Sequence, residues 1–99
     1  MHYGGTVYIL TNRHRSTLYV GVTADLAVRL QQHRDKQFPD SFTARYNLDE
    51  LVYYENFSRI EEAISREKQL KAGSRTKKEA LIDAFNPEWK DLSEEVLAW

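Results

Sequence analysis

Two short segments rich in β-branched and aromatic residues lie near the start of the chain, at residues 6–10 and 17–22. Such residues favour strands, and the polar residues 12–16 between them are typical of a loop, so the sequence predicts an antiparallel hairpin. A hairpin with its pivot between Arg13 and His14 places Tyr8 opposite Tyr19, on the same face of the sheet. Neighbouring tyrosines often only pack against each other, but they can also line a site.

The sequence predicts a third strand at residues 51–57, and helical periodicity with capping residues predicts helices before and after it. The predicted helices cover residues 23–36, one turn near residue 42, residues 58–73 and 74–85, and a short segment that starts at Pro87. Thr23, Ser58 and Ser74 are the expected N-caps, and Ser58 with Glu61 matches a capping box. Three strands with helices between and after them predict an α+β fold, in which helices flank a small sheet.

Composition narrows the class of protein. A chain of 99 residues with 41% hydrophobic residues is expected to form one domain, residues 1–99, with a modest core. No apolar run approaches the roughly 20 residues of a membrane helix, and the first residues lack the pattern of a secretory signal. The absence of cysteine excludes disulfides, thiolate metal sites and a cysteine nucleophile. We therefore expect a cytoplasmic protein that does not associate with membranes.

The charges are segregated, although the net charge is only −1. Residues 65–78 hold six basic residues against one acidic residue, whereas residues 86–99 hold four acidic residues against one basic residue. A basic surface is typical of a protein that binds phosphate groups, although lysine-rich helix ends are often only solvated. The candidate DNA-binding residues are Lys71, Arg75, Lys77 and Lys78.

Glu67 interrupts an apolar stripe on the predicted helix at residues 58–73. The other members of this stripe are Ile60, Ala63, Ile64 and either Leu70 or Lys71. Removing a carboxylate from water costs several kcal/mol unless it is paired, so we expect a cation or a metal beside Glu67. Taken alone, such a residue is ordinarily explained by a salt bridge to an arginine.

Arg29 and His33 lie four residues apart and therefore share one face of the first predicted helix. Each alone has an ordinary explanation, an ion pair for the arginine and a half-buried position for the histidine. With Tyr8, Tyr19 and Glu67, they supply the parts of a metal-assisted phosphodiesterase. A single carboxylate suits Mg²⁺, which keeps most of its waters and adds a phosphate oxygen. Arginine stabilises charge on a phosphoryl group, and a phenol or a metal-bound water supplies proton transfer or the nucleophile.

These motifs resemble those of the GIY-YIG nuclease domain family, over nearly the whole chain. The first motif reads Thr6-Val7-Tyr8, and the second reads Tyr19-Val20-Gly21. The helix that carries Arg29 and the run at residues 66–71 follow in the order of the family pattern. Residues 86–89, which read Asn-Pro-Glu-Trp, are similar to the tails of small stand-alone bacterial members.

The resemblance implies a three-stranded mixed sheet flanked by helices, and hydrolysis of a phosphodiester with one Mg²⁺ or Mn²⁺ ion. Tyr8 and Tyr19 would line the site, with Tyr19 preferred as the base or water-positioning group. Arg29 would contact the scissile phosphate, and Glu67 would hold the metal. His33 would assist proton transfer or form a hydrogen bond with a tyrosine.

Three positions depart from the family pattern. Thr6 replaces the first glycine of the first motif. Val22 stands where the repair-nuclease branch, exemplified by the incising nuclease of the excinuclease ABC system, has a lysine. Glu79 lies near the place of an asparagine in that branch. These differences bear on the rate of catalysis more than on the fold.

Three function classes stay open at this point. The first is an endonuclease that cleaves DNA in repair or recombination, including branched or damaged DNA. The second is a nucleic-acid-binding module without catalysis. The third is an interaction domain that presents four aromatic residues, Tyr53, Tyr54, Trp89 and Trp99, to a protein partner. Retention of all the site residues favours the first class, and we expect a monomer or a weak homodimer.

Overall fold

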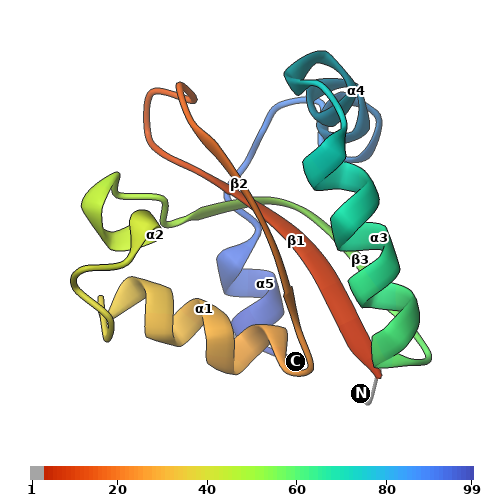
Figure 1. Cartoon of the computed structure of the whole chain (residues 1–99). Helices are drawn as coiled ribbons and strands as arrows, with labels where there is room; N and C mark the ends of the chain where they lie inside the picture. The colour runs from red at the N-terminus through yellow and green to blue at the C-terminus, as the bar shows by residue number, and fades with distance from the viewer. Residues whose placement is uncertain (1–3) are drawn as a thin grey trace.

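The computed structural model describes residues 4–99, in which three strands form one sheet between two layers of helices (Figure 1). The strands are β1 (Gly5–Thr11), β2 (Leu18–Thr23) and β3 (Glu50–Phe57), in the spatial order β2-β1-β3. The helices are α1 (Leu26–Arg34), α2 (Phe42–Arg45), α3 (Ile60–Ala72), α4 (Arg75–Phe85) and α5 (Ser93–Leu97). This arrangement confirms the predicted α+β class with helices flanking a small sheet.

The sheet is antiparallel throughout, which corrects the mixed sheet that the family resemblance implied. In the pairing of β1 with β2, Thr6 lies opposite Thr23 at one end and Thr11 lies opposite Leu18 at the other. In the pairing of β1 with β3, Gly5 lies opposite Phe57 and Thr11 lies opposite Glu50. The physical reason is the path of the connection. Because α1 and α2 carry the chain from the start of β1 back to its end, β3 begins beside Thr11 and runs against β1 (Figure 1).

The hairpin register differs from the predicted one by two residues. Tyr8 lies opposite Gly21, and Tyr19 lies opposite Leu10, so the two tyrosines are diagonal neighbours instead of directly opposed. The pairs are centred between His14 and Arg15, one residue later than predicted, and in this loop Arg15 adopts a positive φ of 57° and its amide donates to the carbonyl of Asn12 at 3.0 Å. An even shift leaves both rings on the same face of the sheet.

Two of the predicted helix starts are wrong. The N-cap of α1 is Asp25, whose side chain accepts a hydrogen bond from the amide of Val28, and not Thr23. α3 begins after Arg59 without a side-chain cap, so the expected capping box at Ser58 does not form. Ser58 instead belongs to the turn after β3, where its carbonyl lies against Gly4.

The other helix predictions are mixed. α4 is capped by Ser74 and α3 ends before Gly73, both as predicted. The last helix starts at Ser93 and not at Pro87, because residues 86–90 fold into a turn held by the side chain of Asn86. None of the helices formed by residues 4–99 is long and apolar enough to cross a membrane.

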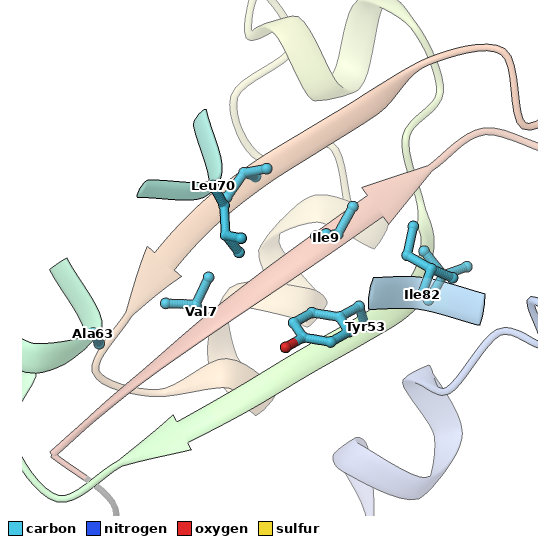
Figure 2. Packing of buried hydrophobic residues seen from close by; sticks show 8 residues of the cluster. Val7, Ile9, Tyr53, Ala63, Leu70 and Ile82 are labelled. Carbon is cyan, nitrogen blue, oxygen red and sulfur yellow. The ribbon is translucent and has the colours of Figure 1, made fainter. Parts of the chain in front are cut away.

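The sheet separates two apolar cores. Val7 and Ile9 point from β1 toward α3 and α4, where they meet Leu70 and Ile82 (Figure 2). The alternate residues of β1, starting with Tyr8, point toward α1 and α5 on the other face. On α3, Ala63 and Leu70 are buried as predicted, but Ile64 is 38% exposed, so the predicted stripe is too wide there. α3 approaches β1 closely at Ala63, whose Cβ leaves no room for a side chain at Gly5.

Candidate active site

Tyr8 is the buried centre of the candidate site. Its side chain is 1% exposed, and its ring lies across the strand partner Gly21. A Cβ at Gly21 would lie only 2.4 Å from Cζ of Tyr8 and 2.5 Å from its hydroxyl, so only glycine leaves room for the ring. The ring of Tyr19 follows at a centroid distance of 6.4 Å. The hairpin therefore brings the two predicted tyrosines together, as the sequence suggested.

His33 joins this pair from α1. Its Nε2 lies 3.2 Å from the hydroxyl of Tyr8, and its ring lies 6.3 Å from that of Tyr19. The other ring nitrogen, Nδ1, lies 2.9 Å from the hydroxyl of Thr43 at the start of α2. Thr43 is itself buried and lies 3.3 Å from the hydroxyl of Ser41, the N-cap of α2. A chain of hydrogen bonds thus runs from β1 through α1 to α2.

The surroundings set the protonation states of Tyr8 and His33. Burial is the main cause that raises the pKa of Tyr8 far above its ordinary value, and the hydroxyl of Tyr19 and the carboxylate of Glu67 raise it further, whereas the charge of Arg29 lowers it. Burial, followed by the charge of Arg29, lowers the pKa of His33 below its ordinary value. At neutral pH the phenol of Tyr8 is therefore protonated, and the imidazole of His33 is neutral and able to accept a proton.

Glu67 approaches the site from α3, which packs against β1 and β2. Its side chain is only 16% exposed, and its Oε2 lies 3.4 Å from Nζ of Lys71, one turn later on the helix. Although α3 covers the opposite face of the sheet, the carboxylate is close enough to act on the pKa of Tyr8. The predicted cation partner of Glu67 is thus a lysine and not an arginine.

A single carboxylate limits which metal the site suits. Within residues 4–99, no three histidine, aspartate or glutamate side chains gather into a cluster that could hold a metal ion. Mg²⁺ usually keeps several waters and binds through one or two carboxylates together with substrate phosphates. Glu67 alone therefore fits an Mg²⁺ ion that arrives with, or is completed by, a phosphate.

Arg29 lines a pocket of about 160 Å³ between α1 and α2. The same pocket is lined by Tyr19 and His33 and by Phe42 and Thr43 of α2. Three of the five predicted site residues, Tyr19, Arg29 and His33, therefore line one opening, and Tyr8 lies behind Tyr19 and His33. Glu67, the fifth, lies on α3 and is not part of this lining, but the charge of its carboxylate contributes to the raised pKa of Tyr8.

The four predicted DNA-binding residues have different neighbours. Lys71 faces Glu67 on α3. Arg75 donates hydrogen bonds to the carbonyls of Arg15 and Ser16 at 2.7 and 2.9 Å, so its guanidinium holds the hairpin loop. Lys77 and Lys78 line a separate groove of about 530 Å³ along α3 and α4.

Sequence reasoning missed two residues that shape the site. Gly21 carries a signal, since a glycine in a strand often marks a close approach, and here it lies against Tyr8. Thr43 carries none, because its contact with His33 depends on how residues 35–41 fold back over α1.

The fold and the site together define a small α+β domain with an aromatic and basic site at its N-terminal hairpin. The chain belongs to the GIY-YIG family, a family of nucleases, because the family model of the GIY-YIG catalytic domain matches residues 4–80. It is also 35% identical, over 82 residues, to the UPF0213 protein of Syntrophus aciditrophicus (strain SB). That alignment covers 83% of this chain and 92% of the relative. No solved structure was found to match the chain.

Proposed function

We propose that this protein is an endonuclease that uses one divalent metal ion to hydrolyse phosphodiester bonds in DNA, in repair or recombination. Membership of a nuclease family implies a nucleic acid substrate, and the proposal adds the metal, the DNA and the cellular role. The observation that carries it is the contact of Tyr8 with His33 beside the pocket that Arg29 and Tyr19 line. An arginine, two phenols and a neutral imidazole at one opening are suited to phosphate binding and proton transfer.

In the proposed reaction, a water oxygen bonds to phosphorus, the ester P–O bond breaks, and the released oxygen takes up a proton. Arg29 binds the non-bridging oxygens of the phosphate and stabilises the charge that builds up on them. Tyr19, the less buried phenol, positions the water, and the neutral imidazole of His33 receives its proton. Glu67 would hold the single Mg²⁺ or Mn²⁺ ion, which when bound supplies positive charge to the phosphate oxygens.

Tyr8 and His33 serve this reaction as a pair. Because Tyr8 stays protonated, it does not act as a base by itself, but its hydroxyl can donate to Nε2 of His33. In that arrangement Nδ1 carries the imidazole hydrogen and donates to the hydroxyl of Thr43. The pair thus fixes the rings around Tyr19, and His33 is the neutral acceptor that can store a proton during turnover.

A nucleic-acid-binding module without catalysis is the second candidate. The observation that favours it is the ion pair between Lys71 and Glu67, because the lysine already neutralises the carboxylate that would hold the metal. Such an i,i+4 pair is weak when partly exposed, at about 0.3–0.5 kcal/mol, so a divalent cation can displace it.

A protein-interaction role finds less support. Trp89 packs against the core under α4 and donates to Asp83 at 2.7 Å, so its ring serves the fold. Tyr54 packs edge-on against Phe85 and Trp99 at centroid distances of 5.2 and 5.3 Å. The predicted aromatic surface is therefore largely engaged within the chain.

The deciding experiment compares DNA cleavage by wild type, Glu67→Ala and a matched control, Glu62→Ala. Glu62 lies on the first turn of the same helix and is exposed. With Mg²⁺ or Mn²⁺, wild type and Glu62→Ala should nick supercoiled plasmid, while Glu67→Ala should not, and all three should bind DNA with similar affinity. A metal ligand stabilises charge that develops in the reaction more than it holds the substrate, which is why binding should persist.

Two outcomes would contradict the proposal. Unchanged nicking by Glu67→Ala, with contaminating nuclease excluded by the behaviour of the other purified variants, removes the metal role of this residue. Binding of DNA by wild type without cleavage of supercoiled, branched or damaged DNA, under either metal, supports the second candidate instead.

A further inference from the structure

A ladder of aromatic rings leads from the candidate active site to the protein surface. Its steps have centroid distances of 6.4 Å from Tyr8 to Tyr19, 6.2 Å from Tyr19 to Phe42 and 4.7 Å from Phe42 to Tyr46. Phe42 is stacked on Tyr19, with an angle of 29° between the ring planes. Exposure increases along the ladder, from 1% at Tyr8 to 48% at Phe42 and 49% at Tyr46. The rings of Phe42 and Tyr46 are therefore about half exposed to solvent, although Phe42 contacts Tyr19, which in turn contacts the buried Tyr8.

The pocket beside these rings has a lining that combines apolar surface with positive charge. Phe38, which is 61% exposed, lines it together with Phe42. The charged groups of the lining are Arg29 and Lys36, and no carboxylate lines the pocket among the residues that the structure describes. An aromatic face next to cationic groups is the arrangement with which proteins hold a nucleotide, the base on the ring and the phosphate on the cation.

We propose that Phe42 is a stacking platform for an unpaired nucleobase next to the phosphate that Arg29 binds. This inference rests on the proposed nuclease function and specifies its substrate as DNA with an unpaired nucleotide at or beside the scissile bond. The requirement for an unpaired base follows from geometry. Within a duplex, both faces of each base are covered by neighbouring base pairs, so only a single strand, a branch or an extruded nucleotide offers a free face.

The position of the platform favours a nucleotide over other occupants. Phe42 lines the same pocket as Arg29, and Tyr46 does not, so a base against the pocket side of Phe42 lies next to the phosphate at the site. A purely apolar partner would gain nothing from Arg29 and Lys36. A second copy of the chain, the main alternative occupant, is tested below.

The test measures binding and does not need cleavage. All proteins carry Glu67→Ala, and the variants are Phe42→Leu, Phe42→Trp and the control Phe85→Leu. Phe85 is 46% exposed on α4, where it packs against Tyr53 and Tyr54, so it is a comparably exposed ring remote from the pocket. Fluorescence anisotropy follows a labelled thymidine oligonucleotide of about 12 nucleotides, within the range of site sizes for single-strand binding. A blunt duplex of matched length and a forked duplex with unpaired arms are the other probes.

Phe42→Leu should weaken binding of the single strand and the fork by about 5- to 150-fold, the equivalent of one lost base–aromatic stack. Binding of the blunt duplex, which depends on phosphate contacts, should stay at the wild-type value. Phe42→Trp should retain tight binding of unpaired DNA, and Phe85→Leu should leave all three affinities unchanged. Loss for the single strand alone, with the fork unaffected, limits the platform to strands without a neighbouring duplex.

Three results would overturn the inference. Equal loss on paired and unpaired DNA means that Phe42 supports the fold or binds DNA generally, and no loss on either means that it stacks no base. A change from dimer to monomer on Phe42→Leu, seen by sedimentation, with unchanged affinity for DNA, means that a second copy covers this surface. Failure of the nuclease proposal is seen separately, because absence of cleavage by the wild-type protein leaves these binding results intact.

Discussion

Substituting Gly21 by alanine tests whether the position of Tyr8 is set by the hairpin. An ideal Cβ at Gly21 lies 2.4 Å from Cζ of Tyr8, whereas carbon atoms in contact prefer about 3.5–4.0 Å. The ring must therefore move by about 1 Å, in a place where it is 1% exposed. Overpacking of this kind costs about 1–3 kcal/mol. We expect the free energy of unfolding of Gly21→Ala to fall by that amount in urea denaturation.

The same displacement should uncouple Tyr8 from His33. Their contact is already 3.2 Å long, so a shift of about 1 Å takes it beyond hydrogen-bonding distance. The imidazole ¹⁵N shifts of His33 report this loss directly. If the proposed reaction holds, the rate of DNA nicking per folded molecule should fall by about 100-fold, the usual effect of misplacing a catalytic group by about 1 Å.

Two other glycines provide matched controls. At Gly73 the nearest atom to a new Cβ is the carbonyl oxygen of Leu70 at 3.4 Å, and φ is −77°, so Gly73→Ala should be tolerated without loss of stability. Gly5→Ala brings its Cβ within 2.9 Å of the Cβ of Ala63, on the opposite face of the sheet. It should lower stability while leaving the ¹⁵N shifts of His33 unchanged. Wild-type stability and His33 shifts in Gly21→Ala would refute this reasoning.

Three further predictions concern the hydrogen bond between His33 and Thr43, the pH dependence of stability and the groove that Lys77 and Lys78 line. Thr43→Val should lower the free energy of unfolding by about 1 kcal/mol and change the tautomer balance of His33, seen in its ¹⁵N shifts, while Thr43→Ser should preserve both. Because the pKa of His33 is lowered by folding, the unfolded chain takes up this proton first as the pH falls below the ordinary value of 6.5. Stability in urea should therefore be full above that pH and decrease below it, and less steeply in His33→Gln; an identical slope in the variant contradicts the assignment. Changing Lys77 and Lys78 together to alanine should flatten the slope of log affinity against log salt by about 2, and an unchanged slope means that DNA does not reach the groove.

The strands and the tyrosine site could be predicted from the sequence because both depend on short-range patterns. The predicted hairpin register is wrong by two residues, but Tyr8 and Tyr19 stay on one face because side chains alternate with a period of two. Arg29 and His33 are correctly placed together because helical periodicity fixes residues four apart. In contrast, the prediction of a mixed sheet is wrong because the direction of β3 depends on the path of residues 35–49.

Contacts between distant parts of the chain explain the remaining differences. The basic run predicts that Arg75 binds DNA, which stays a prediction, and no local pattern reveals that Arg75 also holds a loop about sixty residues earlier in the sequence. The prediction of a capping box at Ser58 is wrong because Ser58 lies in the turn after β3, where its backbone packs against Gly4. Thr43 was overlooked for the same reason, since it reaches His33 only after α2 has folded over α1.

The proposed function requires that Glu67 holds a divalent cation beside Tyr8 and Tyr19. Adding Mn²⁺ to the ¹⁵N- and ¹³C-labelled protein tests it, because the paramagnetic ion broadens signals of nearby nuclei. We expect selective broadening of the signals from the amide of Glu67 and from the rings of Tyr8 and Tyr19, and no broadening of the signals from the ring of Phe85. Glu67→Ala should abolish this pattern. Broadening that persists in Glu67→Ala, or that centres on the acidic C-terminal residues of the wild type, would mean that Glu67 does not hold the ion.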